Sequence, residues 1–216
     1  MPNPAPVAAA HRAELANPAA STHPAGLVAD RAWLAVARAA AGVILFVLLI
    51  AAGARAIIPL PDTPVPVTLQ TVVVLAAGVT LGGRLGLISL AFYVLLGTVG
   101  YEGFAAGRWG LQTVLGATGG YLVGFVLAQP VLGWLTRPRR SGPATLASVV
   151  GAVIAGKAVI FTCGLTWLAI GLGVSPVLAL ELGLWPFLPW MALKLALAAG
   201  AAGLLLPLRR RWFDRI

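Results

Sequence analysis

The stretch from Leu34 to Ala54 decides the fold class and reads LAVARAAAGVILFVLLIAAGA. Arg38 is the only charged residue in this stretch. A helix needs about 20 predominantly apolar residues to cross the hydrocarbon core of a bilayer, and this stretch is long enough. We therefore predict a membrane-spanning helix here.

Five further apolar segments follow, each bounded by proline, glycine or charged residues. The first two of these are short, and short helices bounded by glycine or proline often flank the binding site of a transporter. An even number of spans places both termini on one side of the membrane. The sequence predicts an all-α membrane protein with six transmembrane helices, the later five over residues 67–81, 85–99, 112–135, 145–172 and 187–206.

The composition excludes the other broad classes. Of the 216 residues, 60% are hydrophobic and only 10% are charged, against about 25% charged in soluble domains. A disordered chain would show low hydrophobicity and high charge, and a single cysteine, Cys163, excludes a disulfide scaffold. The class that remains is a multi-pass protein of the cell membrane, surrounded by the lipid bilayer.

The net charge of +9 reflects orientation in the membrane. With both termini in the cytoplasm, eleven arginines lie in inner segments, and only Arg55 and Arg108 lie in outer loops. An excess of Lys and Arg in cytoplasmic segments is the usual topology signal of membrane proteins. We therefore expect no nucleic-acid partner, although the same charge would favour one in a soluble protein.

The two ends of the chain differ from its apolar middle. Residues 1–33 are rich in alanine and proline and lack the apolar core of a signal peptide, so we expect a disordered cytoplasmic tail. Residues 34–208 form the predicted six-helix transmembrane domain, and residues 209–216 form a basic cytoplasmic tail. His11 and His23 stand apart in the first tail, and no metal site is expected.

The apolar segments contain no residue set for catalysis. They hold no Ser/His/Asp constellation, no paired carboxylates and no phosphate-binding loop. We therefore expect no catalytic residue and no cofactor, and the protein is not expected to be an enzyme. A transporter of this kind takes its energy from an ion gradient or from another subunit.

Two lysines lie inside predicted helices. Lys194 has only apolar neighbours, and a charged side chain at the centre of a membrane helix costs roughly 2.5–3.5 kcal/mol. We expect Lys194 to face a partner or a cavity, where it would suit an anionic solute; snorkelling to the outer interface is the alternative. For Lys157 we favour snorkelling to the cytoplasmic side, with contact to a cytoplasmic partner subunit as the alternative.

Other polar side chains are candidates for a binding site. On a lipid-facing surface the Gln70 amide would lack hydrogen-bond partners, so we expect it to point inward. Thr68 and Thr71 can cap free N–H groups of the first helical turn. Arg108 lies in a glycine-rich loop and can hold a carboxylate in bidentate fashion. Tyr121 offers a flat face and a hydroxyl group to a ligand.

Four motifs occur in order along the chain: IPLPDTPVPVTLQT (Ile58–Thr71), LGATGGYLVGF (Leu115–Phe125), GLTWLAIGLG (Gly164–Gly173) and LWPFLPWMALK (Leu184–Lys194). Together they closely resemble the BioY family, whose members are the substrate-binding (S) components of energy-coupling-factor (ECF) biotin transporters. The resemblance covers about residues 35–206.

The resemblance implies a six-helix S component with a biotin pocket near the external face. It also implies a transmembrane coupling subunit and two cytoplasmic ATPase subunits as partners, although some members are reported to act alone. Ala37 and Ala41 resemble the motif by which S components dock on the coupling subunit, and their spacing allows close helix approach; generic helix packing is the alternative. By motif match, the substrate-binding residues are Gln70, Arg108, Tyr121 and Lys194.

The last motif departs from the family pattern PFLPGDxxK. Trp190 stands in place of the glycine and Met191 in place of the aspartate, so Lys194 lacks that acidic partner, for which Glu102 could partly substitute. An S component for a different small vitamin is therefore an alternative reading. A membrane protein without a transport function is a more remote one.

Overall fold

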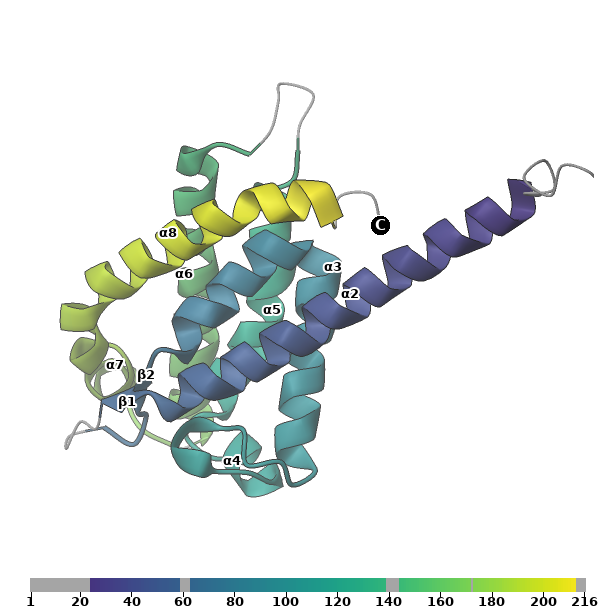
Figure 1. Ribbon diagram of the computed structural model, residues 1–216. Helices are drawn as coiled ribbons and strands as arrows, with labels where there is room; N and C mark the ends of the chain where they lie inside the picture. Colours follow the sequence, from purple (N-terminus) through teal and green to yellow (C-terminus); the bar gives the residue numbers. More distant parts are fainter. Residues whose placement is uncertain (1–23, 59–62, 139–143, 172, 213–216) are drawn as a thin grey trace, which may run out of the picture. The chain divides into compact units, whose positions relative to one another are not determined.

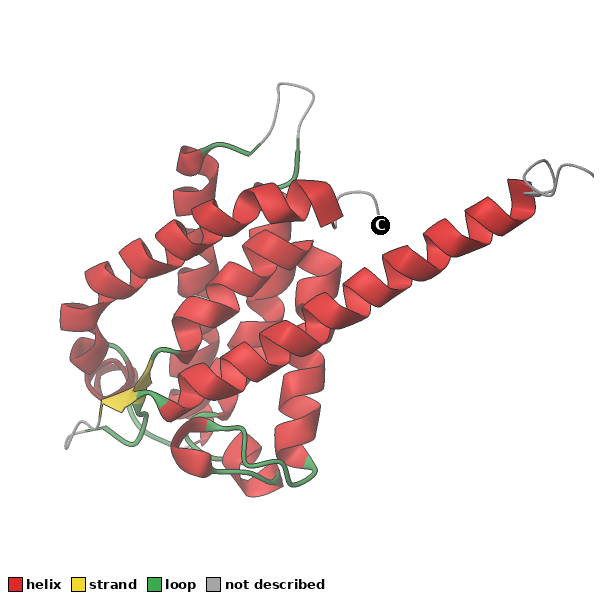
Figure 2. Ribbon diagram, in the orientation of Figure 1, coloured by secondary structure: helices red, strands yellow, loops and turns green. Residues whose placement is uncertain are grey.

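The computed structural model describes residues 24–58, 63–138, 144–171 and 173–212, and the chain there is almost entirely helical (Figure 1, Figure 2). The residues from Arg38 onward form one compact unit, and those up to Ala37 belong to a separate one. The elements are α2 (Pro24–Arg55), β1 (Ile57–Ile58), β2 (Val67–Thr68), α3 (Gln70–Thr98), α4 (Leu111–Leu115), α5 (Gly119–Leu135), α6 (Leu146–Gly171), α7 (Pro176–Gly183) and α8 (Leu188–Trp212).

Several helices in the described part of the chain can span a bilayer. Four helical stretches have the length and apolar composition that a span requires: Ala32–Arg55, Gln70–Thr98, Leu146–Gly171 and Pro176–Arg209. The apolar helix α5 is shorter, with 17 residues. The predicted all-α membrane class is confirmed, whereas the count of six spans and the cytoplasmic side of both termini stay predictions.

A glycine divides α3 into two helical parts. Gly82 has φ 79° and ψ 173°, a conformation that residues with a Cβ rarely adopt, and it falls between the second and third predicted segments. Those two segments therefore meet at a kink within one element. Buried Arg209 lies beside this kink, where its guanidinium donates hydrogen bonds to the Val79 carbonyl oxygen (3.0 Å) and to the Thr136 hydroxyl (2.8 Å).

The start of the first helix differs from the prediction. α2 begins at Pro24, so residues 24–33 are helical and do not belong to a disordered tail. The residues before Pro24, with His11 and His23, lie outside the described part of the chain. The apolar pattern marked only the stretch from Leu34, because residues 24–33 include a proline, a glycine, an aspartate and an arginine, which interrupt the apolar run.

Two other predicted boundaries also differ from those in the structure. α8 continues to Trp212, past the predicted domain boundary at residue 208. The predicted segment 112–135 is broken, because α4 ends at Leu115 and α5 starts only at Gly119.

α5 packs closely against both α3 and α6 through glycines. A Cβ added to Gly133 of α5 would lie 2.0 Å from the backbone nitrogen of Gly83 in α3. A Cβ added to Gly124 of α5 would lie 2.8 Å from Cα of Ile160 in α6. Small residues of this kind let helix backbones approach each other within a membrane. This packing fixes the relative positions of the three helices that supply most of the site.

Candidate ligand-binding site

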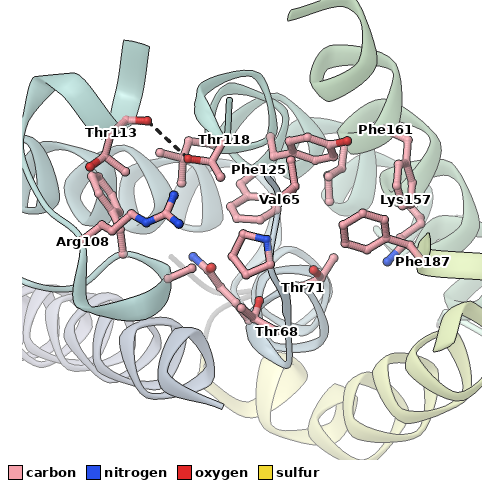
Figure 3. Close-up of a pocket in the computed structure, with 17 residues that line it drawn as sticks. Val65, Thr68, Thr71, Arg108, Thr113, Thr118, Phe125, Lys157, Phe161 and Phe187 are labelled. Atoms are coloured by element: carbon pink, nitrogen blue, oxygen red, sulfur yellow. Dashed lines mark hydrogen bonds between the residues drawn. The ribbon is translucent and has the colours of Figure 1, made fainter. Parts of the chain in front are cut away.

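A cavity in the compact unit gathers side chains from most of the elements (Figure 3). The empty space between its lining side chains is about 640 Å³, part of it open to solvent. Its polar lining residues are Thr68, Gln70, Thr71, Arg108, Thr113, Thr118, Tyr121 and Lys157, and its phenylalanines are Phe104, Phe125, Phe161 and Phe187.

Gln70 lines this cavity with a defined amide orientation. Its Nε2 donates a hydrogen bond to the hydroxyl oxygen of Tyr93 (2.8 Å), and that hydroxyl donates in turn to the carbonyl oxygen of Gly103 (2.8 Å). A tyrosine hydroxyl has one proton, so Tyr93 can only accept from Gln70. Oε1 of Gln70 is therefore the amide atom left to accept a hydrogen bond from a ligand.

A short strand pair places the start of α3 at the cavity. β1 pairs antiparallel with β2, with Ile57 opposite Thr68, and the Leu69 backbone N–H donates to the Ala56 carbonyl oxygen (3.2 Å). These bonds hold the chain just ahead of Gln70. The first residue of α3 is thereby fixed at the wall of the cavity.

Arg108 lies at the exposed side of the cavity, and Figure 3 shows its guanidinium directed toward the interior. The short 3-10 turn Ala105–Gly107 precedes it, with Ala106 in the left-handed region at φ 62°. Arg55 anchors the loop by donating to the Glu102 carbonyl oxygen (2.5 Å). The Glu102 side chain is exposed and does not line the cavity, so it does not substitute for the missing aspartate.

Tyr121 belongs to an aromatic wall. Its ring stacks on Phe187 (centroids 6.4 Å apart, planes at 28°) and meets Phe161 edge-on (6.1 Å, 84°). Its hydroxyl donates to the Gly183 carbonyl oxygen (2.8 Å), which holds the ring in place. Gly164 makes room for the ring, because a Cβ there would lie 2.4 Å from it. The wall therefore presents a rigid apolar surface to a flat ligand.

The two lysines are arranged differently from the prediction. The interpretation of Lys157 as a snorkelling residue is wrong, because its side chain is only 6% exposed and lines the cavity, with Nζ 5.1 Å from the centre of the Phe161 ring. Lys157 shares one face of α6 with Ile160 and Phe161, three and four residues later, and that face forms part of the cavity wall. Lys194 is equally buried but is not a lining residue.

The threonines of the cavity have roles that the sequence did not indicate. Thr68 and Thr71 line the cavity and do not cap α3, whose N-cap is Leu69 without a side-chain hydrogen bond. Thr113 and Thr118 were missed altogether. They reach the cavity because the chain breaks between α4 and α5, where the Thr118 hydroxyl donates to the Thr113 carbonyl oxygen (3.3 Å; Figure 3). The glycine-rich GATGG run was the available signal for that break.

Comparison with known proteins decides the family. Residues 22–211 match the family model described as the BioY family. The chain belongs to the BioY family. It is 38% identical to "Biotin transporter BioY" of Thermotoga maritima, over 72% of this chain and 88% of that protein. It is 36% identical to "Probable biotin transporter BioY" of Pyrococcus horikoshii, over 68% of this chain and 82% of that one.

The fold of this BioY-family chain also matches a solved structure. The crystal structure of the S-component for biotin from an ECF-type ABC transporter superposes with a TM-score of 0.65 and 19% sequence identity, over 89% of this chain and all of that one. The match shows a common fold. Together with the apolar helices, it identifies a multi-pass membrane protein with an S-component-like bundle.

Proposed function

We propose that the chain takes up biotin across the cell membrane as the S component of an ECF-type transporter. The observation that carries the proposal is the cavity, where Gln70, Arg108 and Tyr121 meet beside an aromatic wall. Relatives that are 38% and 36% identical to the chain are named as a biotin transporter and a probable biotin transporter. The protein binds and moves its ligand and does not act as an enzyme.

The cavity suggests one orientation for biotin. The guanidinium of Arg108 matches a carboxylate in bidentate geometry, and its exposed position lets the carboxylate keep part of its hydration. The bicyclic ring system packs against Tyr121, and Oε1 of Gln70 accepts a hydrogen bond from a ureido N–H group. Lys194 has no contact with the ligand in this arrangement, since it does not line the cavity.

The energy for transport comes from partners in this proposal. The chain has no phosphate-binding loop, so a transmembrane coupling subunit and two cytoplasmic ATPase subunits supply it. Six spans with both termini in the cytoplasm place the cavity, at the α4 end of the compact unit, toward the outside. Biotin then enters from the external face.

An exposed groove supports a docking role for the alanine motif. Ala37 and Ala41 are both exposed on α2. Ala41 and Gly42 line a groove together with Leu205 and Leu208 of α8, and these small residues leave space for a helix from another subunit. We assign this surface to the coupling subunit.

Replacing Ala41 by leucine is expected to lower uptake that depends on the coupling module at least fivefold. The larger side chain fills the groove and keeps the second helix away, while biotin binding to the isolated protein stays unchanged. Labelled-biotin uptake and equilibrium binding measure the two effects separately. Ala52→Leu, at another exposed position of α2 that is not in the groove, is the matched control. Equal uptake by both variants would contradict the docking role.

Uptake of labelled biotin in a biotin auxotroph, with and without the coupling subunits, tests the proposed function directly. We expect uptake above background when the subunits are present. A thermal-shift panel of vitamins on the purified protein should show stabilisation by biotin, because a ligand that binds only the folded state raises Tm. Stabilisation by another vitamin and not by biotin would replace biotin as the ligand.

Tyr93→Phe is expected to weaken biotin binding about three- to tenfold, since it frees the Gln70 amide to rotate. The same substitution in a Gln70→Ala background is expected to have little further effect, because the two residues act through one hydrogen bond. Equilibrium binding to the single and double variants measures this coupling. Additive losses would show that Tyr93 acts independently of Gln70.

A further inference from the structure

Lys157 is a buried lysine at the wall of the cavity, and no side chain or carbonyl of the described residues accepts a hydrogen bond from it. Its side chain is 6% exposed, and among the described residues it makes no hydrogen bond or ion pair. Its Nζ lies over the face of the Phe161 ring, 5.1 Å from the ring centre. A cation–π contact recovers only part of the cost of removing an ammonium group from water. The remaining hydrogen-bonding capacity of Lys157 is available to a ligand.

The charges around Lys157 increase its need for an acceptor. Lys194 is a second buried lysine and offers no acceptor. The acidic side chains that the structure describes, Glu102 and Glu181, are both exposed and do not line the cavity. Met191, on α8, carries no charge at the position where the sequence pattern would have an acid.

The cavity presents its two lining cations at opposite sides. Figure 3 shows the Arg108 guanidinium on one side and the Lys157 ammonium on the other, beside Phe161 and Phe187. A carboxylate is more costly to dehydrate than a neutral carbonyl, so it belongs with the exposed Arg108. The bicyclic ring system of biotin, with its neutral ureido carbonyl, belongs with the aromatic side chains around Lys157.

We infer that Lys157 donates a hydrogen bond to the ureido oxygen of biotin and makes the site selective for a strong acceptor at that end of the ligand. The inference rests on the proposed function, because it names a contact within the same cavity. It adds Lys157 of α6 to the site, a residue that the family resemblance did not include among the substrate-binding residues. A ligand that carries a positive charge in place of the ureido oxygen is repelled by Lys157.

The test uses the purified full-length chain and three ligands: biotin, 2-iminobiotin and biotin amide. In 2-iminobiotin a protonated guanidine group replaces the ureido group at neutral pH, and in biotin amide the carboxylate is neutral. We expect the wild type to bind biotin at least about a hundredfold more tightly than 2-iminobiotin at pH 7.5, since a hydrogen bond to a charged group is lost and a repulsion is added.

Lys157→Met is expected to weaken biotin binding at least about tenfold and to reduce the preference over 2-iminobiotin to less than about tenfold. Lys194→Met, a matched change at an equally buried lysine off the cavity, should keep the wild-type preference. Lys157→Met should still bind biotin amide more weakly than biotin. Arg108→Gln should bind the two ligands equally, because the carboxylate lies at Arg108.

Three results would overturn the inference. They are an unchanged preference in Lys157→Met, loss of the preference in Lys194→Met alone, and disappearance of the biotin amide penalty in Lys157→Met. If Lys157→Met does not fold, the wild type still decides, since equal affinity for biotin and 2-iminobiotin also overturns it. Failure of the wild type to bind biotin at all would instead contradict the proposed function.

Discussion

Gly133→Ala is expected to lower the Tm of the protein by about 6–12 °C, which corresponds to about 3 kcal/mol for a chain of this size. The added Cβ would lie 2.0 Å from the backbone nitrogen of Gly83 and 2.5 Å from its Cα. Backbone atoms cannot turn away as a flexible side chain can, so α5 and α3 have to separate. Thermal unfolding in detergent and the yield of monodisperse protein measure the effect.

Gly151→Ala is the matched control for this prediction. Gly151 also lies inside a helix, but a Cβ added there meets no atom of the described residues within 4 Å apart from the backbone of its own helix. Alanine favours a helix over glycine by about 1 kcal/mol, so this variant should be as stable as the wild type or slightly more so. If Gly133→Ala unfolded at the same temperature as Gly151→Ala, the close contact between α5 and α3 would be incorrect.

Gln70→Ala is expected to weaken biotin binding at least about tenfold while the protein stays folded. The substitution removes the one amide oxygen that the hydrogen bonds of Tyr93 and Gly103 orient as an acceptor. Tyr93 keeps its hydrogen bond to Gly103, so the loop remains attached to α3. Equilibrium binding gives the affinity, and Tm without ligand reports on the fold.

Gln112→Ala controls for the loss of a glutamine as such. Gln112 is exposed on α4 and does not line the cavity, so its removal should change biotin affinity less than about twofold. Equal affinities for Gln70→Ala and the wild type would exclude Gln70 from the site. A large loss of Tm in Gln70→Ala would point to a structural role for this side chain.

Much of the fold could be predicted because bilayer thickness sets a required length for apolar helices. Hydropathy located α6 to within a residue at each end, and the glycines before Arg84 marked the division of α3. The start of α2 and the break before α5 were not predicted. At both places, the hydropathy of the residues does not distinguish a helix from a loop. Only the backbone geometry shows where each helix begins.

The candidate site was predictable where a motif fixed both the residue and its surroundings. Gln70, Tyr121 and Arg108 all line the cavity, as the sequence motifs indicated. The sequence did not predict that Lys157 lines the cavity, because position along a helix gives an estimate of depth but not of which face is turned inward. Lys157 faces the cavity since α6 presents that face to it, and this rotation is set by glycines of α5 that pack against α6.

The contact of Arg209 with the kinked helix bears on how the chain can be shortened or tagged. The Val79 carbonyl lies just before the break at Gly82, where helical carbonyls lack partners of their own, and the last helix supplies the missing donor from its C-terminal end. A truncation after residue 208 would leave that carbonyl and the Thr136 hydroxyl without this guanidinium. An affinity tag should therefore be attached beyond Trp212, because Arg209, the first residue of the basic run, has a structural role.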